Sequence, residues 1–209
     1  MTPTHPGDPA RPAQTPTPTG HGSNAGHGSH VGHERHGGLP QDDPRGAGRA
    51  LVVTASNRAA AGVYADTTGP VIAERLVELG FAADGPTVVP DGAPVERALR
   101  DGVTAGYDVI VTTGGTGISP TDRTPEATRR VIDYEVPGIA EAIRAFGRQK
   151  VPTASLSRGL AGVADRTLIV NLPGSTGGVK DGLAVLTDLL PHAVAQLRGV
   201  DHPRPGGAH

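Results

Sequence analysis

The sequence predicts an α/β domain in which a mostly parallel sheet is covered by helices on both faces. Three short runs with apolar centres, at 50–54, 108–112 and 167–171, read as strands that are buried on both sides. Amphipathic segments separate these runs, and this alternation is typical of a doubly wound domain. Because such domains bind ligands at the carboxyl ends of their strands, the residues that follow each strand are the candidates for function.

The remaining elements follow from the spacing of apolar residues and from the turn-forming residues between them. In chain order the sequence predicts a strand at 50–54, a helix over 70–80, a weak strand at 87–89, a helix over 94–103, a strand at 108–112, a helix from 124, a helix over 138–148, a strand at 167–171 and a long helix after it.

Several helix signals are specific. Ile72, Leu76 and Leu79 share one face of the helix over 70–80. Thr124 is expected as an N-cap, with a proline and an acid in the first turn after it. Leucines repeat at helical spacing after 182, and Pro191 is expected to kink or split that helix.

The two ends of the chain differ in composition from its centre. Residues 1–48 are rich in Gly, Pro and His and poor in apolar side chains, so they cannot offset the ordering cost of about 1–2 kcal/mol per residue. We therefore expect a disordered tail at 1–48, one folded domain at 49–200 and a short disordered tail at 201–209. The tail lacks the pattern of a secretory signal and no segment is apolar enough for a membrane span, so we expect a soluble, cytoplasmic protein.

Composition excludes several classes of function. The 209 residues carry a formal net charge of −2, which argues against nucleic-acid binding through bulk basicity. Cysteine is absent, so disulfides, thiolate zinc sites, iron–sulfur clusters and a cysteine nucleophile are excluded.

A glycine-rich turn, TGGTG at 113–117, follows the strand at 108–112. Glycines at this place let backbone N–H groups approach phosphate oxygens, although an ordinary tight turn has the same composition. A second turn of this kind, NLPGS at 171–175, follows the next buried strand. The turns match neither the Walker A loop nor the dinucleotide-binding fingerprint, so the residues alone indicate an anion site.

Two acids flank the glycine-rich turn. Asp122 precedes a predicted helix, where a helix-capping acid is common, and Asp91 stands in a Pro-Asp-Gly turn. Together they favour a site in which carboxylates hold Mg²⁺ beside bound phosphates. Only Lys150 and Lys180 are lysines, so charge stabilisation falls to the metal, to loop N–H groups or to arginines such as Arg58, Arg123 and Arg158.

These motifs together resemble the molybdopterin adenylyltransferase family of Mog/MoaB type, over about residues 50–198. The combination of TGGTG with the helix start DRTPEAT is specific to this superfamily. The motifs that carry the resemblance are ASNR at 55–58, GVYAD at 62–66, TTGGTG at 112–117, DRTPEAT at 122–128, PTASLSR at 152–158 and NLPGS at 171–175.

The resemblance implies a three-layer α/β fold, a homotrimer, and transfer of AMP from Mg-ATP to the terminal phosphate of molybdopterin with release of pyrophosphate. A molybdate-inserting enzyme is the implied partner, with neither nucleic acid nor membrane involved. Asp91 and Asp122 match the family's catalytic carboxylates and are the expected Mg²⁺ ligands, whereas Asn57 stands where family members often have an acid. The implied substrate-binding residues are Ser56, Asp66, Thr113, Gly114, Gly115, Thr116, Gly117, Ser119, Asn171, Pro173, Gly174 and Ser175.

Two alternatives stay open at the level of sequence. The first is a relative that binds molybdopterin or another phosphate ester without transferring AMP, which Asn57 leaves possible. The second places a metal-delivery role in the histidine run at 21–36, because neutral imidazoles at this density bind Zn²⁺, Ni²⁺ or Cu²⁺. A solvated tail of low complexity is the other reading of that run.

Overall fold

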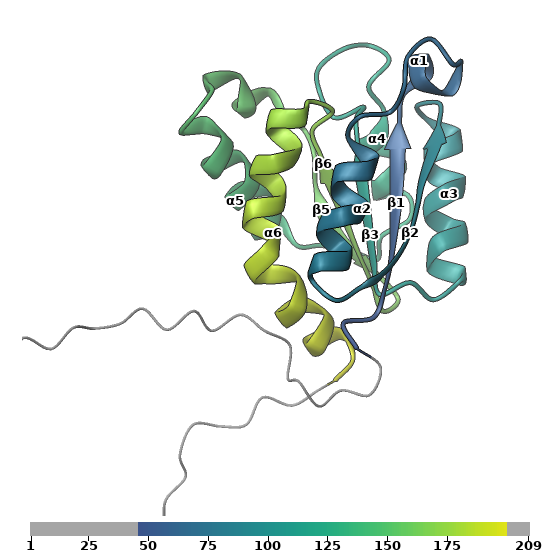
Figure 1. The fold of residues 1–209 in the computed structure, drawn as a ribbon, viewed down its shortest axis with the longest axis vertical. Helices are drawn as coiled ribbons and strands as arrows, with labels where there is room; N and C mark the ends of the chain where they lie inside the picture. The colour runs from purple at the N-terminus through teal and green to yellow at the C-terminus, as the bar shows by residue number, and fades with distance from the viewer. Residues whose placement is uncertain (1–45, 200–209) are drawn as a thin grey trace, which may run out of the picture. The chain divides into compact units, whose positions relative to one another are not determined.

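The structure, a computed structural model, describes residues 46–199 (Figure 1). The tails expected at 1–48 and 201–209 lie outside the described residues, apart from 46–48. Ala47 is only 4% exposed, so burial begins two residues before Arg49. No helix within the described range combines the length and the apolar character needed to cross a membrane.

The centre of the domain is a six-stranded sheet in the order β2-β1-β3-β6-β5-β4. Strands β2, β1, β3 and β6 are parallel, β5 is antiparallel to β6, and β4 is antiparallel to β5. The mostly parallel sheet that the sequence predicts is therefore confirmed. The strands are β1 (Arg49–Ala55), β2 (Ala82–Val89), β3 (Val109–Thr113), β4 (Tyr134–Glu135), β5 (Ala161–Ala164) and β6 (Thr167–Leu172).

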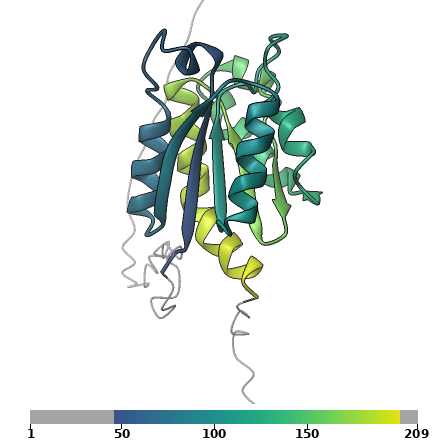
Figure 2. The same ribbon diagram turned by 90° about the vertical axis from the view of Figure 1, so that its right-hand side faces the viewer.

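Helices cover both faces of the sheet, which gives the three layers expected from the family resemblance (Figures 1 and 2). Helices α2, α5 and α6 pack on one face, and α3 and α4 pack on the other. The helices are α1 (Asn57–Ala60), α2 (Gly69–Glu78), α3 (Ala93–Thr104), α4 (Thr124–Arg129), α5 (Pro137–Arg148) and α6 (Thr176–Leu197), with a 3₁₀ turn η1 (Pro152–Leu156).

The strands supply both halves of the core by alternation of their side chains. Val52 and Val111 pack with α2, α5 and α6, whereas Val53 and Ile110 point to the opposite face and pack with α3 and α4. All four are fully buried. Each such side chain contributes about 1.5–3 kcal/mol through burial, so the continuous apolar character of these strands is explained by the two-sided covering.

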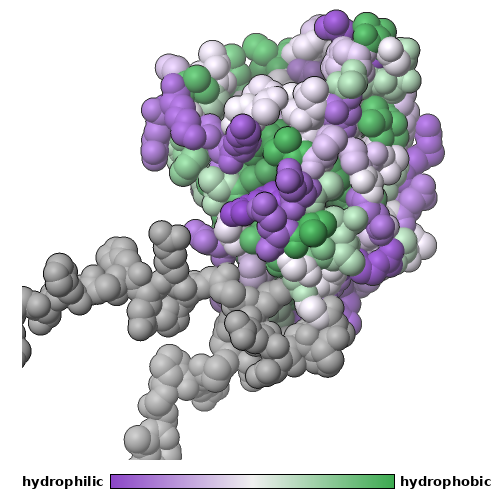
Figure 3. Space-filling view, viewed as in Figure 1, coloured by the Kyte–Doolittle hydropathy of each residue, from purple (hydrophilic) through white to green (hydrophobic). Residues whose placement is uncertain are grey.

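The outer face of α2 and α6 is mixed, with hydrophilic residues beside smaller apolar areas (Figure 3). Pro191 lies inside α6, which continues through it as one helix, so the expected split does not occur. Strands β4 and β5 have no counterpart among the sequence predictions. β5 reads Ala-Gly-Val-Ala, and such small residues give no strand signal by themselves.

The prediction that Thr124 is the N-cap of α4 is wrong. Arg123 occupies the N-cap position without a side-chain cap bond, and Thr124 is the first helical residue. The Thr124 side chain is fully buried, and its hydroxyl donates to Asp91 Oδ1 at 3.5 Å instead of capping the helix. A contact with another loop has therefore taken the place of a local cap.

Adjacent positions on α2 test this packing. Leu76 is fully buried against the sheet, whereas the neighbouring Val77 is 59% exposed. We expect Leu76→Ala to lower the free energy of unfolding by about 2–5 kcal/mol. Val77→Ala should change it by less than about 0.5 kcal/mol. Urea denaturation monitored by circular dichroism measures both, and equal losses would contradict the described orientation of α2.

Candidate functional site

Two adjoining cavities lie among the loops at the carboxyl ends of β1, β2, β3 and β6. The smaller, of about 310 Å³, is lined by Asp66, Asp91 and Asp122, and we call it the acidic cavity. The larger, of about 710 Å³, is lined by Lys150 and Lys180, the two lysines of the chain, and we call it the lysine cavity.

The glycine-rich turn separates the two cavities. Gly114 and Gly115 line the acidic cavity, Thr116 and Gly117 line the lysine cavity, and Gly174 of the β6–α6 loop lines both. The sequence-predicted residues around the acidic cavity are Ser56, Asp66, Asp91, Thr113, Gly114, Gly115, Asp122 and Gly174. Those around the lysine cavity are Thr116, Gly117, Pro173, Gly174 and Ser175. Ser119 and Asn171 line neither.

Asp91 stands in the turn between β2 and α3, next to the glycine-rich loop. Its carboxylate accepts hydrogen bonds from the Thr124 hydroxyl and from the backbone N–H of Arg123. Burial and the neighbouring charge of Asp122 raise the pKa of Asp91, and these two hydrogen bonds oppose the rise only in part. Two carboxylates that repel one another in a partly buried site are the setting in which a bound cation is favourable.

The Asp122 carboxylate is oriented by its own turn. Asp122 Oδ2 accepts from the backbone N–H of Ser119 at 3.1 Å, and the backbone N–H of Asp122 donates to the Ser119 carbonyl at 3.0 Å. A Cβ on Gly117 would lie 2.7 Å from Asp122 Oδ2, so a larger residue there would displace this carboxylate. Ser119 thus acts on the site through Asp122.

Asp66 joins the acidic cavity to the start of α2. Its carboxylate accepts from the hydroxyls of Thr54 and Thr68 at 2.7 and 3.2 Å, and from the backbone N–H groups of Thr68 and Gly69 at 3.0 Å each. Burial acts to raise the pKa of Asp66, but these hydrogen bonds outweigh it and hold the pKa below its ordinary value. Asp66 is therefore an ionised carboxylate committed largely to the protein.

Gly115 allows the two acidic loops to approach one another. It has a φ of +60°, and a Cβ here would overlap with Asp91 Oδ1 and Thr124 Oγ1. Gly114 before it has a φ of +88°, and a Cβ on it would overlap with the Ala55 carbonyl oxygen. Both positions therefore exclude any side chain, which explains the glycine pair of the motif.

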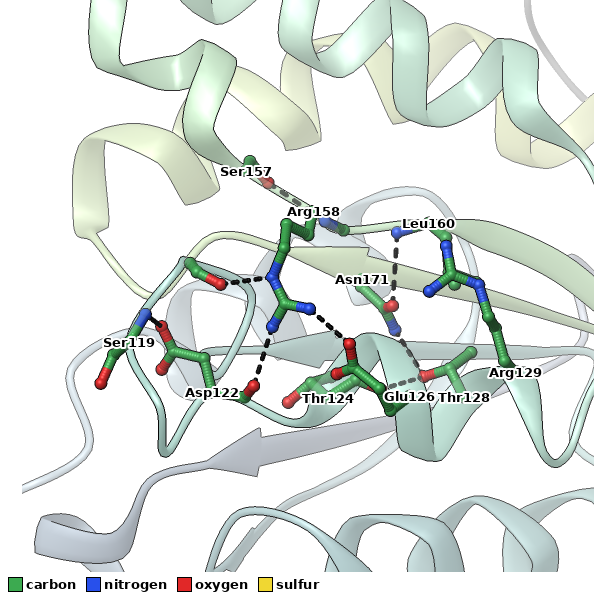
Figure 4. Close-up of polar contacts among 12 residues, drawn as sticks. Ser119, Asp122, Thr124, Glu126, Thr128, Arg129, Ser157, Arg158, Leu160 and Asn171 are labelled. Carbon is green, nitrogen blue, oxygen red and sulfur yellow. Dashed lines mark hydrogen bonds and ion pairs between the residues drawn. The ribbon is translucent and has the colours of Figure 1, made fainter.

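The Asn171 side chain bonds to other parts of the domain. It is 3% exposed, its Nδ2 donates to the hydroxyls of Thr112 and Thr128 at 3.0 Å each, and its Oδ1 accepts from the Leu160 N–H at 3.3 Å (Figure 4). These bonds link β6 to β3 and to α4. The buried Thr113 acts similarly, because its hydroxyl donates to the Pro173 carbonyl at 2.8 Å and so ties two loops together.

Asn57, which stands where the family often has an acid, lines the acidic cavity. Its Oδ1 accepts from the backbone N–H of Asp91 at 3.1 Å. An amide oxygen makes this bond as a carboxylate oxygen would. Asn57 thus fixes the Asp91 turn with a neutral side chain.

The lysine cavity holds charged residues that the sequence did not assign to a site. Lys150 forms an ion pair with Asp181, and Lys180 and Arg144 line the same cavity. One sequence signal existed, since the only two lysines of an arginine-rich chain occur here. The two lysines are 30 positions apart and lie in no recognisable motif, so the sequence alone does not show that they line the same cavity.

A metal ion would not find a ready-made cage in this domain. Across residues 46–199 there is no group of three or more His, Cys, Asp or Glu side chains that could hold one. Asp91 and Asp122 can supply two oxygen ligands, which suits Mg²⁺ because it commonly takes one or two carboxylates and completes its shell with phosphates and water. The histidine run at 21–36 lies outside the described residues.

Comparison with known proteins gives consistent results. Residues 51–192 match the family model described as "Probable molybdopterin binding domain". A molybdenum cofactor biosynthesis bifunctional protein of Synechococcus elongatus is 40% identical over 154 residues, which cover 73% of this chain and 48% of that protein. A molybdopterin adenylyltransferase of Helicobacter pylori strain J99 is 37% identical over 71% of this chain and 86% of that protein.

Solved structures agree with this assignment. The molybdopterin biosynthesis Mog protein from Mycobacterium ulcerans superimposes with a TM-score of 0.69 at 55% identity, over 72% of this chain and 97% of that one. The chain spans about half the length of the bifunctional relatives and most of the length of the single-domain ones.

The fit around Gly115 predicts a strong effect of a single methyl group. We expect Gly115→Ala to lower the free energy of unfolding by about 1–3 kcal/mol, because the backbone is left-handed and the new Cβ overlaps with Asp91. Gly138→Ala is the matched control, since it lies in α5 with open space around its Cβ, and should be neutral or stabilising by about 0.4–1 kcal/mol. Thermal and urea unfolding measure the free energy of unfolding of both variants, and equal effects of the two substitutions would contradict the prediction.

The hydrogen bonds to Asp66 predict a pH dependence of stability. Because the folded pKa lies below the ordinary value of 3.8, the ionised group stabilises the fold above that value and loses this contribution as the pH falls through the folded pKa. We expect Asp66→Asn to be less stable than the parent at about pH 7, and the difference to shrink below about pH 4. A difference that grows on acidification would show that the sign is wrong.

Proposed function

This chain belongs to the family of molybdopterin-binding domains, and from that premise we propose that it is a molybdopterin adenylyltransferase of molybdenum cofactor biosynthesis. It would transfer AMP from ATP to molybdopterin and release pyrophosphate. The observation that carries the proposal is the pair of cavities that meet at the glycine-rich turn, one with carboxylates and the other with lysines. A reaction between two phosphorylated molecules needs two sites that meet at one point.

We assign one substrate to each cavity by its charge. The ATP phosphates would occupy the acidic cavity, where Asp91 and Asp122 can share Mg²⁺ with them and Gly114 and Gly115 leave the loop backbone open. Molybdopterin would occupy the larger cavity, where Lys150 and Lys180 can attract its phosphate. Bound in this way, the two reacting phosphates would approach each other across the turn.

In the proposed reaction, an oxygen of the terminal phosphate of molybdopterin attacks the α-phosphorus of ATP. A new P–O bond forms, the bond from the α-phosphorus to the oxygen bridging to the β-phosphorus breaks, and pyrophosphate leaves with that electron pair. The attacking phosphate is already an anion, so no side chain needs to remove a proton. The protein therefore acts by positioning and by stabilising charge.

The chain's own groups have distinct parts in this scheme. Asp91 and Asp122 would hold Mg²⁺, which when bound neutralises phosphate charge. Backbone N–H groups of the glycine-rich turn would bind phosphate oxygens, and Lys150 and Lys180 would offset the repulsion between the two anionic substrates. Asp66, which is committed to Thr54, Thr68 and Gly69, would keep the cavity wall in place.

The proposal extends to assembly and to place in the cell. We infer a homotrimer that acts in the cytoplasm and passes its product to a molybdate-inserting enzyme. Support comes from the family resemblance and from the relatives named as bifunctional molybdenum cofactor biosynthesis proteins, of which this chain covers about half. Light scattering coupled to gel filtration tests the trimer directly, and a monomer or dimer would contradict it.

The reaction itself is tested with purified protein, ATP, MgCl₂ and molybdopterin, with mass spectrometry of the products. We expect adenylylated molybdopterin and pyrophosphate from the parent chain, and loss of activity when Mg²⁺ is omitted. Asp122→Asn should lower kcat by about 100-fold or more. Asp188→Asn, an exposed position on α6, is the matched control and should retain parental activity.

The outcomes separate the alternatives. Binding of molybdopterin by the parent chain without any product would favour a binding-only relative. Equal loss of binding and activity in Asp122→Asn would assign that carboxylate to ligand binding or to structure, contrary to the role proposed here.

A further inference from the structure

Arg158 lies between η1 and β5 and faces the loop that carries the glycine-rich turn and Asp122 (Figure 4). Its backbone N–H donates to the Thr116 carbonyl at 2.8 Å. Its Nε donates to the Gly117 carbonyl at 2.6 Å, and its Nη2 donates to the Asp122 carbonyl at 2.8 Å. Its Nη1 forms an ion pair with Glu126 on α4. One residue thus binds the loop at both ends and the helix that follows.

The loop has few other tertiary anchors in the described structure. The Gly114 N–H donates to the Leu172 carbonyl at 3.3 Å, and the Thr124 hydroxyl donates to Asp91 at 3.5 Å. The Thr124 N–H donates to the Gly115 carbonyl at 3.1 Å, and Ser119 bonds to Asp122 and Thr121 within the turn. Ile118 at its tip is 69% exposed and does not fasten the loop by burial. Arg158 therefore makes more of the tertiary hydrogen bonds to this loop than any other described residue, including the one to the Asp122 carbonyl.

Planarity of the peptide bond extends this effect to Asp91. In a trans peptide the C=O and the following N–H point in opposite directions. The Asp122 carbonyl is bound by Arg158, and the N–H of the same peptide, that of Arg123, donates to the Asp91 carboxylate. By binding the Asp122 carbonyl, the guanidinium thus fixes the plane of the peptide whose N–H acts on Asp91.

The same geometry sets the direction of the loop N–H groups. Because the Thr116 and Gly117 carbonyls point at Arg158, the N–H groups of Gly117 and Ile118 point away from it. Gly117 lines the lysine cavity. By binding these two carbonyls, Arg158 therefore keeps the N–H groups of Gly117 and Ile118 directed to the opposite side of the loop.

Glu126 on α4 is the charged partner of Arg158 in this contact. Burial acts to raise the pKa of Glu126, but the hydrogen bond and charge of Arg158, the backbone N–H of Glu126 and the charge of Arg123 together outweigh it and hold that pKa below the ordinary value. Glu126 Oε2 is buried and has no hydrogen-bond partner among the described residues, so the carboxylate depends on Arg158 for its stabilisation. The planar fork of a guanidinium can bind three acceptors at fixed angles, whereas an ammonium group cannot.

We propose that Arg158 is a positioning residue for adenylyl transfer, which aims Asp122, Asp91 and the loop N–H groups at the substrates by holding the carbonyl side of the β3–α4 loop. This inference rests on the proposed function for its catalytic consequence. It does not require Arg158 to touch either substrate. It predicts that geometry and not positive charge is what position 158 contributes.

Arg158→Lys tests this distinction because it keeps the charge and loses the fork. We expect hydrogen–deuterium exchange of peptides covering 114–123 to accelerate about tenfold or more, with the rest of the sheet unchanged. We expect kcat to fall about 100-fold, while ATP still binds at one molecule per chain by calorimetry. Arg129→Lys is the matched control, since Arg129 pairs with the exposed Glu135 and contacts no residue of the loop.

Parental exchange and parental kcat in Arg158→Lys would overturn the proposal. A parallel fall in kcat and in ATP binding, in a variant whose circular dichroism is parental, would also overturn it, because Arg158 would then be needed for ATP binding itself. If Arg158→Lys does not fold, Glu126→Gln replaces it and should accelerate exchange of the same peptides with ATP stoichiometry unchanged, whereas parental exchange would count against the proposal. A parent chain without transferase activity would refute the proposed function alone, since exchange and ATP binding still report on the loop.

Discussion

The hydrogen-bonded ladder of β2, β1, β3 and β6 has apolar side chains on both of its faces, and a layer of helices covers each face. An unpaired polar group buried inside such a ladder would cost free energy because it would lose its hydrogen bonds to water. Polar chemistry is therefore confined to the strand ends, where parallel strands bring four loops to one edge. The two cavities, the glycine pair and the facing carboxylates all follow from this arrangement.

Much of the fold and part of the site could be predicted from sequence, because those features depend on residues that lie close together along the chain. The helical spacing of apolar residues around Leu76 predicts a helix face, and the apolar run around Ile110 predicts a buried strand. Asp91 and Asp122 could be paired because each follows a strand of the same sheet. Gly115 could be placed near an anion by its motif, although its close approach to Asp91 could not be known.

What the sequence did not reveal depends on contacts between distant segments. Thr124 is a residue type that commonly caps helices, yet its hydroxyl donates a hydrogen bond to Asp91 of another loop. Asn171 stands at a strand end, where ligand-binding residues are common, yet three distant partners bond to both of its N–H donors and to its amide oxygen. Lys150 and Lys180 line one cavity only because α5 packs against α6. Asn57 bonds to the Asp91 N–H, a contact that exists only once the β2–α3 turn has formed.

The closeness of the two glycine loops has a thermodynamic consequence. A Cβ on Gly174 would lie 3.1 Å from the Gly114 Cα, so the backbones of the β6–α6 and β3–α4 loops are in direct contact. Gly174 also faces both cavities. A molecule that shifts one loop must therefore shift the wall of the other cavity. Linkage then requires that whatever factor the first occupant imposes on the affinity for the second, the second imposes on the first. Cooperativity between the two occupants would be a property of two touching glycines, with no separate hinge or regulatory domain needed to create it.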